Sequence, residues 1–391
     1  MIQCRRAEEE GRRRTGTAEE EEEEARSRDQ GEEGFLAASF SQHVVAIPYP
    51  RRGHINPMMN LCKLIALRNP SDFLITVVVT EEWLSFIECE PKPPNVRFAT
   101  IPNVIPSEKN RAADFPGFIK AAQTKMEHPA EQLLRGMEVP ITVLLYDCFL
   151  YWVVNIGQRL NIPVASFSAI SATVFSMFYH YNLLVENGHV GDKFSGNIEE
   201  IVDYLPGVGP ILVADLVTSF NGKGKEVTQI FLKAILMCAK AQFLIFASVY
   251  ELEAQVIDAF RSNHSMPVYA IGPAIPYFNL NDVGNDQNAP DYVRWLDRQP
   301  EGSVLYISQG SFLSVSSSQL DEVVAGVHDS GVRYMWIARE DTSLFKNEND
   351  EKGLVVPWCD QLRVFLMVRW GHFGHIAVGI QPKKGLFVES L

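Results

Sequence analysis

The sequence predicts an α/β protein with two Rossmann-like domains. From His43 onward, short apolar runs typical of buried strands alternate with stretches of helical periodicity. The alternation starts afresh after a segment rich in Pro and Asn, which interrupts both patterns. Strands that alternate with helices imply parallel sheets with right-handed crossovers. We therefore expect two doubly wound domains joined by a linker.

In the first block, five apolar runs are short enough to be strands and long enough to cross a sheet. The strands expected there cover residues 44–48, 73–79, 96–101, 141–146 and 164–167. Asn56 and Pro57 have the residue types that favour an N-cap and a first helical position. We therefore predict that the first helix covers residues 58–68.

The second block repeats the pattern over fewer elements. Its expected elements are strands over residues 303–308, 333–338 and 354–357 and a helix over residues 318–330. The domain boundaries that follow are a tail over 1–40, an N-terminal domain over 41–272, a linker over 273–290 and a C-terminal domain over 291–391.

Composition and charge exclude several classes of protein. The chain has 391 residues, of which 46% are hydrophobic and 21% charged, as in ordinary soluble globular proteins. Residues 1–34 hold twelve acidic and seven basic side chains, so the tail supplies five of the thirteen net negative charges. That tail has too little apolar surface to order itself, so we expect it to be disordered. The mildly acidic remainder disfavours nucleic acid as a partner.

Other segments indicate the compartment. No apolar run is long enough to span a bilayer, and the charged N-terminus lacks the hydrophobic segment of a signal peptide. The six cysteines lie far apart with no Cys-x-x-Cys pair, which argues against a zinc site and a disulfide framework. We expect a cytoplasmic monomer that contacts no membrane.

Two polar residues follow predicted strands at the sheet edge where open α/β proteins bind ligands. His54 comes after the first strand, beside a helix N-terminus whose dipole favours the neutral imidazole that a general base needs. Asp147 comes directly after the strand over 141–146, where its carboxylate can orient such a base. For His54 a structural role has about equal weight. For Asp147, position alone favours a cap on the helix that starts near Tyr151.

Several segments resemble, in order, those of plant UDP-dependent glycosyltransferases. The first is the run from His43 to Pro57 that contains Gly53-His54-Ile55-Asn56-Pro57. The later ones are Tyr204-Leu205-Pro206-Gly207, Tyr250-Glu251-Leu252-Glu253, Ile271-Gly272-Pro273, Trp295-Leu296-Asp297 and residues 303–311. Together these segments cover the chain from about His43 to Val364. The resemblance implies the GT-B type of fold, with an acceptor-binding N-terminal domain and a donor-binding C-terminal domain.

The strongest single similarity lies in residues 353–364, which read GLVVPWCDQLRV. They resemble the opening of the family's signature box, where a Trp stacks on uracil and a Gln meets the ribose. In the Ser-Phe-Gly-Ser turn, Gln309 replaces the usual Phe, but the Gly and Ser that approach the donor phosphates are kept. The donor-binding candidates implied by the resemblance are Gly310, Ser311, Trp358, Cys359 and Gln361.

The same resemblance implies the reaction. His54 is the catalytic base, supported by Asp147, and the reaction is inverting transfer of a sugar, most often glucose, from a UDP-sugar to a hydroxyl or carboxyl of a small lipophilic acceptor. The UDP-sugar is a co-substrate, and neither a metal nor another cofactor is needed. Arg51 and Arg52 depart from the family, since they occupy a turn where Gly is usual. Ala169 is a second departure, at a position where many members have a Thr near the sugar.

After Val364 the resemblance ends. If the third base of each codon is joined to the first two bases of the next, permitted synonymous codons turn residues 365–391 into LSHGSVGAFWTHCGWNSTKEGAFRGVP. That is the rest of the family's box. We infer a shifted reading frame near Val364, which leaves the second domain incomplete and removes the residues that hold the diphosphate. Transferase activity is therefore expected to be impaired or lost.

Two other classes of α/β enzyme do not fit the sequence, and one rival function does. A nicotinamide-dependent oxidoreductase requires Gly-x-Gly-x-x-Gly at the first turn, where this chain has Arg51-Arg52-Gly53-His54. An α/β-hydrolase requires Gly-x-Ser-x-Gly after a strand, and the chain has none. The serious rival is a non-catalytic protein that keeps only the acceptor pocket. The aromatic and apolar candidates for lining that pocket are Phe149, Trp152, Phe175, Phe178 and Tyr179.

Overall fold

The computed structural model describes residues 40–108, 114–191, 194, 196–220, 225–276, 290–308, 317–338, 352–367 and 375–377. The chain divides into two compact units, Met1–Ile275 and Pro276–Leu391. Their boundary lies inside the segment predicted as a linker. The predicted tail up to residue 39, most of the linker and both Gly310 and Ser311 lie outside the described residues.

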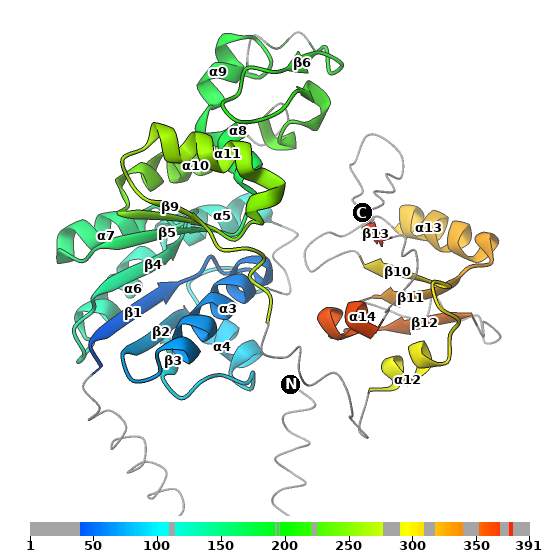
Figure 1. Cartoon of the computed structure of the whole chain (residues 1–391), viewed down its shortest axis with the longest axis horizontal. Coiled ribbons are helices and arrows are strands. Elements are labelled where there is room, and N and C mark those ends of the chain that lie inside the picture. Colours follow the sequence, from blue (N-terminus) through cyan, green and yellow to red (C-terminus); the bar gives the residue numbers. More distant parts are fainter. Residues whose placement is uncertain are drawn as a thin grey trace, which may run out of the picture. The chain divides into compact units, whose positions relative to one another are not determined.

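The first unit contains a seven-stranded parallel sheet with the order β3-β2-β1-β4-β5-β8-β9 (Figure 1). Its strands are β1 (Gln42–Ile47), β2 (Phe73–Thr80), β3 (Val96–Ile101), β4 (Val143–Asp147), β5 (Val164–Ser168), β8 (Phe243–Phe246) and β9 (Val268–Ala270). Alternate residues of β1 face opposite cores, since Val45 and Ile47 lie in one hydrophobic cluster and Val44 and Ala46 in the other. Both faces of this sheet are therefore buried, as a parallel sheet requires.

Helices cover the two faces unequally. Helices α3 (Arg52–Arg68) and α4 (Glu81–Ile87) pack on the face of Val44 and Ala46. The opposite face is covered by α5 (Phe115–Thr124), α6 (Glu127–Arg135), α7 (Trp152–Leu160), α8 (Ala172–Tyr179), α10 (Lys225–Met237) and α11 (Tyr250–Asn263). Helix α9 (Tyr181–Glu186) and the antiparallel hairpin of β6 (Ile201–Val202) and β7 (Ile211–Leu212) lie between α8 and α10 in the chain.

The second unit contains a four-stranded parallel sheet with the order β12-β11-β10-β13. Its strands are β10 (Val304–Ser308), β11 (Arg333–Ile337), β12 (Gly353–Val356) and β13 (His375–Ala377). Helices α12 (Asp291–Asp297) and α14 (Gln361–Met367) contribute to the cluster that contains Tyr306, and α13 (Ser317–Ser330) packs on the cluster that contains Tyr334. Since Leu305 pairs with Tyr334 in the register, these tyrosines belong to opposite faces.

The predicted start of the first helix is wrong. Helix α3 begins at Arg52 rather than Met58, its N-cap is Arg51, and Pro57 lies inside it. The Arg51 carbonyl accepts from the His54 and Ile55 amides, at 2.9 and 2.8 Å, and so closes the first turn ahead of the proline. Pro57 has no amide hydrogen, so the helical hydrogen bond to the Gly53 carbonyl is missing. A Cβ added at Gly53 would meet nothing within 4 Å. His54 therefore lies in the first turn of the helix rather than in a loop before it.

The described residues include four free cysteines and show which helices could span a membrane. Among the described residues the free cysteines are all buried, namely Cys62, Cys148, Cys238 and Cys359. Burial raises the pKa of the Cys62 and Cys238 thiols to about 12, so they stay protonated near neutral pH. In the described part of the chain, no helix is both long and apolar enough to cross a bilayer.

A buried histidine at the start of β1 is expected to make stability depend on pH. The His43 Nδ1 hydrogen bonds to the Val139 carbonyl at 3.0 Å, and Nε2 lies 2.8 Å from the Thr76 hydroxyl, which accepts from Arg97. Burial lowers the pKa of His43 below its ordinary 6.5, and the Arg97 charge lowers it further, against the backbone bond. The unfolded chain therefore takes up this proton first as pH falls through 6.5 toward the folded pKa.

We predict that the unfolding free energy falls over that window by at most about 1.4 kcal/mol per pH unit on account of His43. Denaturant titrations of wild type, His43→Gln and His128→Gln between pH 7.5 and 5.5 measure the slope. The change at buried His43 should flatten it, and the change at exposed His128 should not. A His43→Gln protein with the wild-type slope contradicts the assignment.

Gly207 is expected to be irreplaceable in the segment that docks on α11. Its φ of +74° lies in the left-handed region, and a Cβ there would lie 2.4 Å from the Gln255 carbonyl oxygen. Gly207→Ala should therefore cost roughly 2 kcal/mol or more of unfolding free energy. Gly209→Ala is the matched control, because a Cβ at Gly209 meets nothing within 4 Å. Equal denaturation midpoints for the two variants would show that this close approach does not constrain the fold.

Candidate active site

The first unit places His54 and Asp147 at the point where the strand order reverses. β2 lies on one side of β1 and β4 on the other, so β1 and β4 flank the topological switch point of the sheet. Ligands of open α/β sheets bind outside the carboxyl ends of the strands at such a point. His54 follows β1, and Asp147 is the last residue of β4. The fold therefore brings together two residues that are far apart in sequence.

His54 and Asp147 are joined by a direct hydrogen bond. The His54 Nδ1 lies 2.8 Å from Asp147 Oδ2. Asp147 is fully buried, and His54 is 9% exposed. A carboxylate only accepts hydrogen bonds, so Nδ1 carries the proton and Nε2 of the neutral ring keeps its lone pair. This tautomer lets Nε2 remove a proton from a ligand while Asp147 stabilises the imidazolium that forms.

The alternative role of Asp147 as a cap on the helix near Tyr151 is wrong, although its carboxylate does fix the turn before that helix. Its Oδ1 accepts from the backbone amide of Phe149 at 3.1 Å, which fixes the turn after β4. The N-cap of α7 is Tyr151, with no side-chain capping bond. Asp147 thus uses one oxygen for the turn and the other for His54. The turn therefore holds the carboxylate in place while its other oxygen is bonded to His54.

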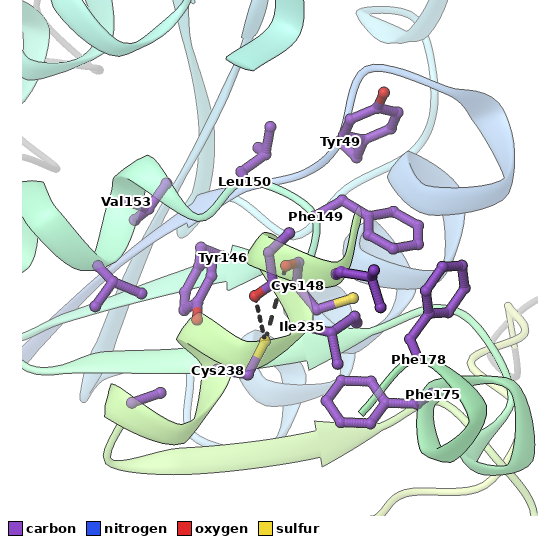
Figure 2. Packing of buried hydrophobic residues seen from close by; sticks show 14 of the residues in the cluster. Tyr49, Tyr146, Cys148, Phe149, Leu150, Val153, Phe175, Phe178, Ile235 and Cys238 are labelled. Carbon is purple, nitrogen blue, oxygen red and sulfur yellow. Dashed lines mark hydrogen bonds between the residues drawn. The ribbon is translucent and has the colours of Figure 1, made fainter. Parts of the chain in front are cut away.

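Aromatic rings surround the imidazole. Tyr49 and Phe149 lie 5.2 and 5.6 Å from His54 between ring centroids, and Phe231 lies 4.4 Å from Phe149. Figure 2 shows Tyr49 and Phe149 in the packed cluster on this face of the sheet. Gln123 donates from Nε2 to the Phe149 carbonyl, which ties α5 to the same turn. The imidazole therefore lies among aromatic side chains of the buried cluster.

Of the residues predicted to line an acceptor pocket, the structure brings Phe149 to His54. Phe178 is one ring further away, 6.1 Å from Phe231. Trp152 is fully buried and donates to the Ala122 carbonyl, and Phe175 packs on Phe246 and Phe260 in the core. Tyr179 pairs with His264 through its hydroxyl, at 2.7 Å. These last three are structural residues, as their helical spacing allowed.

The loop after β5 is held by a carboxylate from α11. Glu253 accepts from the amides of Ala172 and Thr173 at 3.0 and 2.8 Å, and from the hydroxyls of Thr173 and Ser248. Its backbone is not helical, so α11 bends where this carboxylate is placed. Burial raises the pKa of Glu253, but these hydrogen bonds outweigh burial and hold it below its ordinary value. The loop that includes Ala169 is therefore fixed beside the turn of Asp147, since β4 and β5 are neighbours.

The donor-binding candidates of the second unit have different surroundings. Trp358 is 64% exposed, in the segment between β12 and α14. Gln361 donates from Nε2 to the Tyr306 hydroxyl at 2.9 Å. Cys359 is buried, and its sulfur lies 3.7 Å from the same hydroxyl, so its side chain belongs to the core. Burial raises the pKa of the Cys359 thiol, which keeps it protonated.

Sequence reasoning missed part of this site. Tyr49, Gln123 and Tyr306 received no role, and Glu253 was noted only as part of a similar segment. The sequence signals for these four residues were weak, since each is a common residue type in a segment predicted as helix, strand or loop.

In the described ranges no group of three or more His, Cys, Asp or Glu side chains is placed to hold a metal ion.

The fold has two α/β units, and the first carries a buried histidine–aspartate pair at the switch point of its sheet. These features define the class of protein with which the chain is compared. No family model matches the chain. Curated relatives do. UDP-glycosyltransferase 87A2 of Arabidopsis thaliana is 48% identical over 334 residues, covering 85% of this chain and 72% of the relative. UDP-glycosyltransferase 87A1 of the same plant is 47% identical over 335 residues, covering 84% and 76%.

Solved structures share the fold. Medicago truncatula UGT71G1 complexed with UDP-glucose gives a TM-score of 0.66 at 20% identity, covering 83% of this chain and 73% of that one. Phytolacca americana UGT2 complexed with UDP-2fluoro-glucose and pterostilbene gives 0.64 at 21% identity, with the same coverages. The chain belongs to the plant UDP-glycosyltransferases and has the GT-B fold that its sequence predicted. By this resemblance it is an enzyme that uses a UDP-sugar.

The network at Glu253 yields a prediction. Glu253→Gln puts an amide group where two backbone amides now donate to a carboxylate, so it should lower the unfolding free energy by roughly 1–3 kcal/mol. Hydrogen exchange of the Ala172 and Thr173 amides should become faster. Exposed Glu251, on the same helix, supplies the control Glu251→Gln, which should change stability by less than about 0.5 kcal/mol. Unchanged exchange at Ala172 in the Glu253 variant contradicts this role.

Proposed function

We propose that the fold carries out inverting transfer of a sugar, most often glucose, from a UDP-sugar to a hydroxyl or carboxyl of a small lipophilic acceptor. The observation that carries the proposal is the 2.8 Å contact between His54 Nδ1 and Asp147 Oδ2 at the switch point. His54 Nε2 takes the acceptor proton, and the acceptor oxygen attacks the anomeric carbon from the face opposite UDP. The bond from that carbon to the diphosphate breaks, and UDP leaves with the electron pair.

The donor is assigned to the second unit. Exposed Trp358 supplies a surface for stacking on uracil, and Gln361 supplies a polar group for the ribose. Gly310 and Ser311 are assigned to the phosphates from the sequence alone. Cys359 is kept as a donor-site residue only through its backbone, because its side chain is buried. No metal takes part in this proposal, and the protein acts as a cytoplasmic monomer.

We also propose that this chain transfers sugar poorly or not at all. Residues 365–391 do not resemble the family, whereas permitted synonymous codons allow the neighbouring reading frame to spell the rest of its signature box. That lost stretch holds the groups that bind the leaving diphosphate. Removing one preorganised donor costs on the order of a hundred- to a thousand-fold in rate, so losing several leaves little activity.

The test compares the chain as it stands with a version in which the frame is restored after codon 364. With UDP-glucose and a panel of phenols, alcohols and carboxylic acids, the restored protein should release UDP and form glycosides at a rate at least roughly a thousand-fold higher. In the restored protein His54→Ala should lose about a hundred- to ten-thousand-fold. Equal activity of the two chains contradicts the impairment, and an unaffected His54→Ala contradicts the base.

The second candidate function is a binding protein that keeps the acceptor site without using a donor. The aromatic surroundings of His54 favour it as the function left to this chain if the donor site is lost. Calorimetric titration separates the two readings. Saturable binding of a lipophilic phenol with no heat from UDP-glucose supports the binding protein, and donor binding followed by hydrolysis or transfer supports the enzyme.

A further inference from the structure

Two tyrosine hydroxyls hold the segment that presents Trp358. The Tyr292 hydroxyl, from α12, accepts from the backbone amide of Asp360 at 3.1 Å. The Tyr306 hydroxyl, from β10, accepts from Gln361 Nε2 at 2.9 Å. Both tyrosines are buried, at 8% and 2% exposure. The short stretch between β12 and α14 is thus tied to two other elements of its unit.

Chemistry makes these hydroxyls suitable as fixed acceptors. Burial raises the pKa of Tyr306 to about 12 and also raises that of Tyr292, so both are neutral across the physiological range. A neutral hydroxyl that accepts from an amide holds the donor in one orientation. In Gln361 the hydrogen bond fixes Nε2 directly. It also fixes the direction of the carboxamide oxygen, because both atoms belong to one planar group.

Neighbouring side chains divide between the core and solvent. Cys359 is buried against Tyr306, whereas Trp358 directly before it is 64% exposed. Asp360 accepts from the Arg363 amide at 3.1 Å and so closes the first turn of α14. The tyrosines therefore act where the backbone turns from an exposed indole to a helix. A shift of this turn would move Trp358 and Gln361 together.

We propose that Tyr292 and Tyr306 are positioning residues for uridine. They hold the Trp358 ring for stacking and the Gln361 carboxamide for a ribose hydroxyl, without touching the ligand themselves. This inference rests on the proposed function, since it assumes that the segment receives the uridine part of the donor. It adds the requirement that the binding of uridine depends on the buried hydroxyls of Tyr292 and Tyr306, which do not contact the ligand.

The experiment is a UDP titration of the full chain, followed by Trp fluorescence, with Trp358→Phe to identify the signal of that ring. Tyr292→Phe and Tyr306→Phe should each raise the Kd for UDP roughly three- to tenfold, the usual worth of one hydrogen bond. Tyr334→Phe is the matched control. Tyr334 is equally buried on the neighbouring strand, and its hydroxyl bonds to His328 on the other face of the sheet. It should change the Kd by less than about twofold.

A second arm separates positioning from a general loss of stability. If Tyr306 acts through Gln361, Tyr306→Phe should add nothing to the Kd in a Gln361→Ala background. Additive losses, wild-type affinity in both tyrosine variants, or an equal loss in Tyr334→Phe would each overturn the inference while leaving the donor site intact. A wild-type chain that binds no UDP would instead overturn the donor site itself, and this inference with it.

Discussion

The candidate site depends on one hydrogen bond between a residue of helix α3 and the last residue of strand β4. His54 Nδ1 and Asp147 Oδ2 meet because β1 and β4 are parallel neighbours whose carboxyl ends lie at the same edge. Removing either partner would leave a buried polar group without its bond, which is costly in a site of low dielectric constant. The pair therefore constrains the turn after β4, the first turn of α3 and the rings packed around them.

Other contacts support this pair from behind. Asp147 Oδ1 fixes the Phe149 amide, Gln123 fixes the Phe149 carbonyl, and Glu253 fixes the loop after the adjacent strand. Each is a polar bond made at a place where the chain leaves regular structure. Together they explain how loops at the edge of a sheet hold reactive groups in a defined position, which catalysis requires.

Much of the fold could be predicted from the sequence, and the reasons are physical. β3 has the predicted limits, and the strands predicted in both units are present within two residues at either end, because buried parallel strands are continuous apolar runs. Strands β8 and β9 were not predicted, because they are short and each carries an exposed aromatic residue, Phe243 in β8 and Tyr269 in β9.

The start of α3 was predicted too late. Pro57 is a strong local signal for a first turn, yet backbone hydrogen bonds to Arg51 begin the helix earlier. The histidine and aspartate could be named from position and resemblance, whereas the supporting bonds of Gln123 and Tyr306 depend on tertiary contacts that no local pattern encodes.

The most direct test of the account is the tautomer of His54, read from the 15N shifts of its ring nitrogens at a pH where the ring is neutral. The account predicts the Nδ1–H form in wild type, a shift toward the Nε2–H form in Asp147→Asn, and no change in the control Asp203→Asn, an exposed residue of the same unit. A wild-type ring that carries its proton on Nε2 would contradict the account, because that nitrogen could then not accept a proton from any acceptor.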